Sequence, residues 1–184
     1  MRANAPERIE TARLILRRPR RRDAEVIFDR YANDSEVTRY LAWPRHRNLR
    51  DTLQFLQFSD SEWDHSPGGP YLIELRASGQ VIGSTGIEFE TEYRASTGYV
   101  LARDAWGRGF ASEALLGIVG IGPALGLARL HAIVHFEHAA SRRVLEKCGF
   151  VHEGTLTGHT LFPNIDEHRP FDVASYSRVF ERPR

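Results

Sequence analysis

The chain has 184 residues, 41% of them hydrophobic and 10% aromatic, which is the composition of an ordinary globular protein; we expect one domain over residues 1–184. Its 25 basic and 24 acidic residues nearly cancel, so the charge does not indicate a nucleic-acid partner. No apolar run approaches the ~20 residues that cross a bilayer, and residues 1–11 lack the apolar core of a signal peptide. The single cysteine excludes an internal disulfide and a cysteine-rich metal site, and we expect a cytoplasmic protein.

Local signals organise the first half of the chain. Pro19 closes an early apolar run, Asp23 is placed to cap a helix, and Ser78-Gly79 has the composition of a hairpin turn. Apolar residues recur at helical spacing from Leu49 to Trp63. The expected elements are a strand over 14–16, helices over 24–31 and 49–63, and strands over 71–76 and 80–89.

Strands alternate with helices in the second half. A strand over 96–102 leads through two glycines into a helix over 111–121. A strand over 130–136 then precedes a helix over 139–148, which Gly149 ends. Two final strands are expected over 151–161 and 171–180. This order predicts an α/β (α+β) fold in which helices are layered on one mixed sheet.

The turn before residue 111 carries the main chemical signal. Gly107 and Gly109 flank Arg108 where a strand passes into a helix. The first N–H groups of a helix have no partner within it, and that end is partly positive, so it can bind phosphate. Glycines admit a ligand close to the backbone, Ala111 keeps the entrance open, and Arg108 could add charged donors. The turn predicts a pyrophosphate site; a plain tight strand-to-helix connection is the alternative.

Three separated stretches carry a family resemblance. Tyr99-Val100-Leu101 with Trp106-Gly107-Arg108-Gly109-Phe110-Ala111 resembles the coenzyme A motif of the GNAT superfamily of N-acyltransferases, Trp106 standing where the general pattern has Gln or Arg. Ser141-Arg142-Arg143-Val144-Leu145-Glu146-Lys147-Cys148-Gly149-Phe150 resembles a second motif of its RimJ/RimL branch. Glu10-Thr11-Ala12-Arg13-Leu14-Ile15-Leu16-Arg17 resembles the start of that branch, which acetylates protein N-terminal amines and other amines.

The resemblance implies both a fold and a reaction. The fold is a mixed, mostly antiparallel seven-stranded sheet with helices on both faces. The reaction is direct transfer of an acetyl group from acetyl-CoA to a primary amine, which is either a protein N-terminus or a small molecule. No metal is implied, and a homodimer is plausible within the family. Two alternatives remain: a catalytically weak acyl-CoA-binding module, and transfer of a different acyl group.

The resemblance also assigns roles to individual residues. The residues that it implies bind the coenzyme are Tyr99, Val100, Leu101, Trp106, Gly107, Arg108, Gly109, Phe110, Ala111, His138, Ser141 and Arg143. Ser141 would protonate the departing thiolate or hold the sulfur, and the alternative is a helix-surface or capping serine. His138 departs from the family, which has asparagine there. Arg142 and Lys147 share a helix with Arg143 and could meet the ribose phosphate, although a solvated basic face explains them equally well.

The general base is the least determined part of the site. A carboxylate can accept the proton of the attacking amine. We prefer Glu88, with Glu90 two residues on and on the same side of the strand, so that the two carboxylates could bind a cationic amine. Glu153 and Asp172 on the last strands are the other candidates, and each of the four could instead be a solvent-facing residue.

Other conspicuous residues are explained more simply by structural roles than by functional ones. The arginines over 17–22 are expected in a solvated loop rather than a nucleic-acid arm, and Cys148 as a small buried residue rather than a nucleophile. His131, His135 and His138 could bind a metal, but no carboxylate spacing supports this. The cluster Trp63-Asp64-His65 either borders the acceptor pocket or serves aromatic packing.

Overall fold

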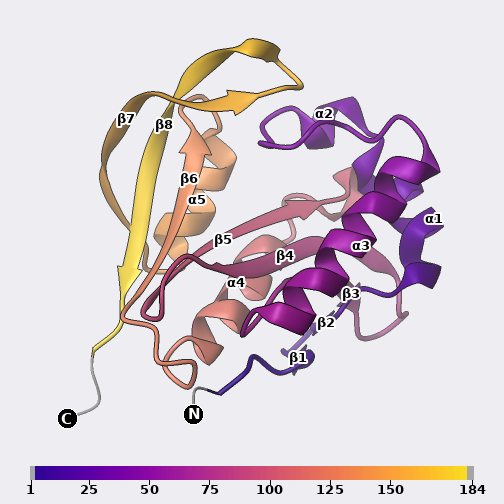
Figure 1. Ribbon diagram of the computed structural model, residues 1–184, viewed down its shortest axis with the longest axis horizontal. Helices are drawn as coiled ribbons and strands as arrows, with labels where there is room; N and C mark the ends of the chain where they lie inside the picture. The colour runs from indigo at the N-terminus through magenta and orange to yellow at the C-terminus, as the bar shows by residue number, and fades with distance from the viewer. Residues whose placement is uncertain (1–2, 182–184) are drawn as a thin grey trace.

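The computed structural model of the protein describes residues 3–181 (Figure 1). Within that range eight strands form one sheet in the order β1-β2-β3-β4-β5-β6-β8-β7. The strands are β1 (Arg8–Glu10), β2 (Leu14–Arg17), β3 (Pro70–Leu75), β4 (Val81–Phe89), β5 (Arg94–Leu101), β6 (Arg129–His135), β7 (Val151–Phe162) and β8 (Asp166–Val179). The α-helices are α1 (Ala24–Ile27), α2 (Ser35–Thr38), α3 (Leu49–His65), α4 (Phe110–Ile121) and α5 (Ala139–Lys147). There are also two short 3-10 helices, η1 (Arg21–Asp23) and η3 (Arg103–Ala105), and a π-helix, η2 (Phe28–Ala32), that continues α1.

The sheet confirms the predicted fold class and corrects its strand count. Neighbouring strands are antiparallel except for β5 and β6, which are parallel. The described residues hold eight strands rather than the seven expected, because the three-residue β1 pairs with β2 through Ile9 and Leu16. A strand of three residues is too short to show an alternating pattern in the sequence.

Helices cover both faces of the sheet, as predicted. In Figure 1, α1 and α3 lie on the face toward the viewer, whereas α4 lies behind the strands. Leu115 and Ile118 of α4 join one buried apolar cluster, while Ile27 of α1 and Leu56 of α3 join a second. Successive strand residues point to opposite faces, so a single strand such as β5 contributes to both clusters.

Local chemistry fixes the ends of the longer helices. The Asn48 side chain accepts a hydrogen bond from the Arg50 amide, and Asp51 bonds back to the Asn48 amide, which forms a capping box for α3. α5 ends where Gly149 takes a φ of +77°, a conformation that glycine adopts at little cost. The predicted helices over 49–63, 111–121 and 139–148 are confirmed with small shifts of their ends.

The arginine segment is a solvated loop only in part: Arg20, Arg21 and Arg22 are exposed, as predicted, whereas Arg17 is held within the fold. Arg17 is half-buried and bonds the carboxylate of Asp23 at 2.8 Å and that of Glu74 at 2.7 Å. The prediction that the Asp23 side chain caps α1 is therefore wrong: the carboxylate bonds Arg17 and also accepts the Arg20 amide at 2.7 Å. Burial alone would raise the pKa of Asp23, but the hydrogen bonds from Arg17 and Arg20 outweigh it and hold this pKa below its ordinary value.

The parallel pair β5–β6 positions the site. The two strands pair only at their beginnings, through Arg94–Arg129, Ala95–Leu130 and Ser96–His131, and then diverge. β4 continues to pair with β5 as far as Leu101, and β8 pairs with β6 along its length. The sheet is therefore opened between two of its central strands. No helix within residues 3–181 is long and apolar enough to cross a membrane.

Candidate active site

The opening between β5 and β6 exposes backbone that a regular sheet would pair. Beyond Ser96, β5 has β4 on one side only, so groups of residues 97–101 that face β6 lack a strand partner there. Unpaired backbone N–H and C=O groups seek other partners. An extended ligand lying in the opening could take the place of the missing strand.

The glycine turn lies at the far end of β5. Gly107 and Gly109 have φ values of +71° and +78°, which residues with a side chain rarely adopt. The first intrahelical bond of α4 runs from the Glu113 amide to the Gly109 carbonyl, so the amides of residues 110–112 have no carbonyl partner within the helix. A Cβ at Gly107 would meet nothing within 4 Å, so the turn is open on that side. These features fit a diphosphate at the helix N-terminus.

Trp106 fastens this turn to the strand that precedes it. Its indole N–H donates to the carbonyl oxygen of Leu101 at 2.8 Å, while the ring remains 46% exposed. The bond takes a carbonyl at the end of β5 and fixes the start of the turn. Leu101, whose side chain is buried, therefore cannot offer that carbonyl oxygen freely to a ligand.

Tyr99 and Ser141 meet across the opening. The Tyr99 hydroxyl lies 2.9 Å from the Ser141 hydroxyl, and it also lies 3.0 Å from the Ser141 carbonyl oxygen, to which it can donate. Burial raises the pKa of Tyr99, so its hydroxyl stays protonated at neutral pH. The first turn of α5 is thereby held against β5.

A cavity of about 310 Å³, which we call the splay cavity, occupies the opening. β5 contributes Tyr99 and Val100, α5 contributes Ser141, and β4 contributes Glu88. Aromatic side chains from other elements close it, among them Phe58 of α3. The cavity thus combines hydroxyl groups, a carboxylate and apolar walls, the mixture that small-ligand sites have.

Two histidines, His135 and His138, line the splay cavity. His138 stands at the N-cap of α5 and stacks on Tyr40 at 4.7 Å between ring centroids. Burial, and then the neighbouring His135, lower the pKa of His138, so the imidazole is neutral at pH 7. His135 Nδ1 accepts the Glu137 amide at 3.2 Å, which places the ring proton on Nε2.

Comparison with known proteins identifies the family. The family model described as "Acetyltransferase (GNAT) domain" matches residues 13–151. The chain belongs to the GNAT family of acetyltransferases. It is 36% identical to the uncharacterized N-acetyltransferase YoaA of Bacillus subtilis over 177 residues, which cover 95% of this chain and 97% of that protein.

Solved GNAT structures share the fold. RimJ of Mycobacterium smegmatis, in complex with CoA-disulfide, matches with a TM-score of 0.84 at 24% identity, covering 97% of this chain and 90% of that one. The microcin C7 self-immunity acetyltransferase MccE, in complex with acetyl-CoA and AMP, has a TM-score of 0.84 at 20% identity, covering 97% and 99%. The GNAT fold that the motifs predicted is confirmed, and RimJ is among the proteins that share it. The protein is a GNAT N-acetyltransferase that uses acetyl-CoA.

The structure brings only part of the predicted site together. Glu88, Tyr99, Val100, His138 and Ser141 all line the splay cavity. The predicted coenzyme residues that do not line this cavity are Leu101, the turn residues 106–111 and Arg143. Of these, the turn residues form the separate helix N-terminus described above, and Arg143 is exposed on α5.

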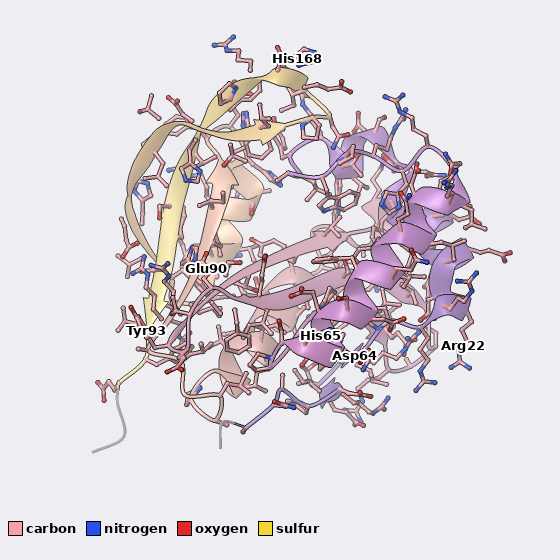
Figure 2. All side chains as sticks on the ribbon, in the orientation of Figure 1. Arg22, Asp64, His65, Glu90, Tyr93 and His168 are labelled. Carbon is pink, nitrogen blue, oxygen red and sulfur yellow. The ribbon has the colours of Figure 1, made fainter. Side chains whose placement is uncertain are left out.

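The predicted pairing of Glu88 with Glu90 is wrong. β4 ends at Phe89, and the Glu90 carboxylate bonds Arg94 at 2.6 Å and His131 at 2.8 Å. Figure 2 shows Glu90 near Tyr93, at the end of the sheet where β4 turns into β5. Glu88 lines the splay cavity and Glu90 does not, so the two carboxylates cannot bind a cationic amine together.

The two other base candidates are also engaged elsewhere. The Arg129 guanidinium, together with the Ser177 hydroxyl, lowers the pKa of Glu153 to about 2. Asp172 accepts the Gly158 amide at 2.8 Å on the β7–β8 hairpin. Neither carboxylate lines the splay cavity. Glu88 therefore remains as the predicted base among the four carboxylates that the sequence singled out.

Sequence reasoning missed two carboxylates. Glu62 of α3 lines the splay cavity together with Glu88 of β4. Glu113 of α4 accepts the Thr11 hydroxyl at 2.6 Å and the Arg13 guanidinium at 2.6 Å. Arg13 also donates to the Arg108 carbonyl at 3.1 Å, so the turn between β1 and β2 supports the glycine turn. The helical spacing of α3 could have pointed to Glu62, since it lies one turn beyond Phe58.

The remaining conspicuous residues have structural partners. Trp63 donates its indole N–H to the Pro70 carbonyl at 2.8 Å and packs in the core, and Figure 2 shows Asp64 and His65 at the C-terminal end of α3. None of these three lines the splay cavity. Burial raises the pKa of the Cys148 thiol, which does not favour a nucleophile. Among residues 3–181, no group of three or more potential ligands is placed to hold a metal ion.

Proposed function

We propose that the acceptor is a primary amine that enters the splay cavity and attacks the acetyl carbonyl directly. The observation that carries this proposal is the cavity itself, which brings Glu88, Tyr99 and Ser141 together where β5 and β6 part. In the transfer, the amine nitrogen bonds the acetyl carbon, the carbon–sulfur bond breaks, and the sulfur leaves as a thiolate. The residues must therefore accept one proton and supply another.

The coenzyme would lie along the opened edge of β5. Backbone groups of Tyr99 and Val100 would bond the pantetheine arm, and the amides of residues 108–111 would bond the diphosphate. His138 would contact the arm from the N-cap of α5. Arg143, exposed on the same helix, would meet the ribose phosphate. The open side of Gly107 and the parting of the strands support this placement.

Ser141 would supply the proton to the sulfur. The Tyr99 hydroxyl has a single proton, and it lies within bonding distance of both oxygens of Ser141. When Tyr99 donates to the carbonyl, the Ser141 hydroxyl donates back to Tyr99. When Tyr99 instead donates to the Ser141 hydroxyl, the serine proton is free to bond the thiolate. Tyr99 would thus be a positioning residue for Ser141.

Glu88 would accept the proton of the amine, directly or through water. It is exposed on β4 and lines the cavity, so solvent can carry the proton away. Glu62 on the facing helix adds negative charge to the same cavity, which favours entry of a cationic amine. The neutral His138 is the competing acceptor in this cavity.

Several broader features belong to the same proposal. The acceptor is a protein N-terminus or a small-molecule amine. Because MccE was crystallised in complex with acetyl-CoA and AMP, small-molecule amines that carry a nucleotide are among the candidates. We further propose that residues 1–184 act as one domain in the cytoplasm. A homodimer remains a prediction.

The test is thiol release from acetyl-CoA with a panel of amines, comprising peptides with free or blocked N-termini and small primary amines. We expect free thiol with at least one unblocked amine and none with its blocked counterpart. Titration calorimetry with coenzyme A runs in parallel. A protein that binds the coenzyme but releases no thiol with any amine is a binding module, and this outcome would overturn the proposal.

A further inference from the structure

A second cavity adjoins the splay cavity on the side of the α helices. It has a volume of about 480 Å³, and we call it the α3 cavity because residues in the first turns of α3 line it. Trp43, Phe55, Phe58 and Ser84 line both cavities. The two spaces therefore meet at these side chains. A molecule whose amine reaches the splay cavity could extend into the α3 cavity.

Aromatic rings make one wall of the α3 cavity. The ring centroids of Trp43 and His46 are 5.3 Å apart, and those of His46 and Phe55 are 6.5 Å apart. His46 Nδ1 is bonded to the buried Thr52 hydroxyl at 2.9 Å, which fixes the middle ring, and burial lowers its pKa, so it is neutral at pH 7. Phe58 is 52% exposed at the junction with the splay cavity. A row of rings favours an apolar, flat partner.

The rim of the α3 cavity is basic. Arg45 forms no ion pair with any residue in the described range, and Arg47 reaches Glu167 only at 3.9 Å. The Asp51 carboxylate also lines the cavity, but it is bonded to the amides of Arg47 and Asn48, at 2.7 and 3.3 Å. The two guanidinium groups outnumber this one carboxylate. The Arg47–Glu167 pair is long and exposed, so Arg47 can bind an anionic group together with Arg45.

A residue in the turn between β7 and β8 holds the wall and the rim of the α3 cavity in place. The Asn164 side chain, in the turn between β7 and β8, accepts the Arg45 amide at 2.7 Å. It also donates to the carbonyl oxygens of Thr38 and Trp43 at 2.8 and 2.9 Å. Figure 1 shows this hairpin reaching over toward α2. The segment that carries Trp43 and Arg45 is thus fixed before any ligand binds, which reduces the ordering that binding requires.

We infer that the α3 cavity is a specificity site for a primary amine that carries an aromatic ring and, beyond the ring, an anionic group. The amine would lie in the splay cavity, the ring against the Trp43–His46–Phe55 wall, and the anion at Arg45 and Arg47. This inference rests on the proposed function for the placement of the amine. It goes beyond that proposal by selecting among the amines that the enzyme accepts.

The test compares three amines with the same ring and amine: tyramine, 4-(2-aminoethyl)benzoate and O-phosphotyramine. Thiol release gives kcat/KM for each with the wild type, the double variant Arg45→Ala with Arg47→Ala, and the control Arg50→Ala. The backbone amides of Arg45 and Arg47 keep their bonds in the double variant. Arg50, an exposed arginine at the start of α3, lines neither cavity.

We expect the wild type and the control to prefer at least one anionic amine over tyramine by roughly tenfold or more. The double variant should lose this preference, so that its kcat/KM values for the three amines become similar. The carboxylate and phosphate arms show which anion is preferred. Equal kcat/KM values for all three amines in the wild type, or a preference retained by the double variant, would overturn the inference.

Calorimetry separates this inference from the proposed function. The anionic amines are titrated into each protein saturated with coenzyme A, so binding is measured without turnover. Tighter binding of an anionic amine than of tyramine, lost in the double variant, supports the α3 cavity even if no thiol is released. Equal binding of the three amines to the wild type counts against it, whether or not other amines are acetylated.

Discussion

Replacement of Gly107 by alanine tests the glycine turn most sharply. At a φ of +71° an alanine side chain crowds the following carbonyl, which costs about 1–2 kcal/mol. If the turn relaxes in the free protein, coenzyme binding must restore its strained conformation. The strain energy is then taken from the binding free energy, and the Kd for coenzyme A rises about 5- to 30-fold. If the turn keeps its shape, the new methyl group projects into the open space where the diphosphate would approach. Both routes weaken binding of coenzyme A.

Gly79 provides a matched control for this variant. It has a φ of +70° in the hairpin between β3 and β4, and a Cβ there would also meet nothing within 4 Å. Gly79→Ala should therefore lower the melting temperature by about 2–8 °C through the same strain, without changing the Kd for coenzyme A. Calorimetry measures Kd and thermal unfolding measures stability. If Gly107→Ala binds coenzyme A as tightly as Gly79→Ala and the wild type, the reasoning is refuted.

Three further predictions concern the chemistry and the fold. Ser141→Ala should lower kcat by about 10- to 100-fold with little change in the Kd for coenzyme A, whereas a parallel loss of binding would point to a structural role. Glu88→Gln should lower kcat by a similar factor and Glu90→Gln should not; equal effects in the thiol-release assay would exclude Glu88 as the base. Asp23→Asn should cost about 1–3 kcal/mol at pH 7, measured by urea unfolding, because Arg17 loses a buried, negatively charged partner. The lowered pKa of Asp23 means that its contribution is complete above the ordinary value of 3.8 and is lost as pH falls below it, so a difference that stays constant into that range contradicts the assignment.

Local sequence signals were sufficient for the longer elements. The apolar spacing from Leu49 to Trp63 predicted α3, because a buried helix face needs that period. Gly107, Gly109 and Gly149 were predicted where the chain turns, and all three have positive φ. Such features depend on residues close together in the chain, so a single sequence contains them.

Features set by distant contacts could not be predicted. β1 and α2 have three and four residues, too few to show a period. The alternation of side chains along a strand predicted that Glu90 lies beside Glu88. However, β4 ends before Glu90, and the Glu90 carboxylate bonds residues of β5 and β6. The support of the glycine turn by Arg13 and Glu113 joins residues 100 positions apart. The residues of β5 and β6 carry no local signal for the place where the two strands part.

We propose that the amides at the glycine turn bind the diphosphate of acetyl-CoA. Titration of ¹⁵N-labelled protein with acetyl-CoA, followed by amide NMR, tests it directly. The amide resonances of Gly107, Arg108 and Gly109 should shift strongly and saturate together with binding. Saturated binding that leaves these three resonances in place would show that the diphosphate does not bind at this turn.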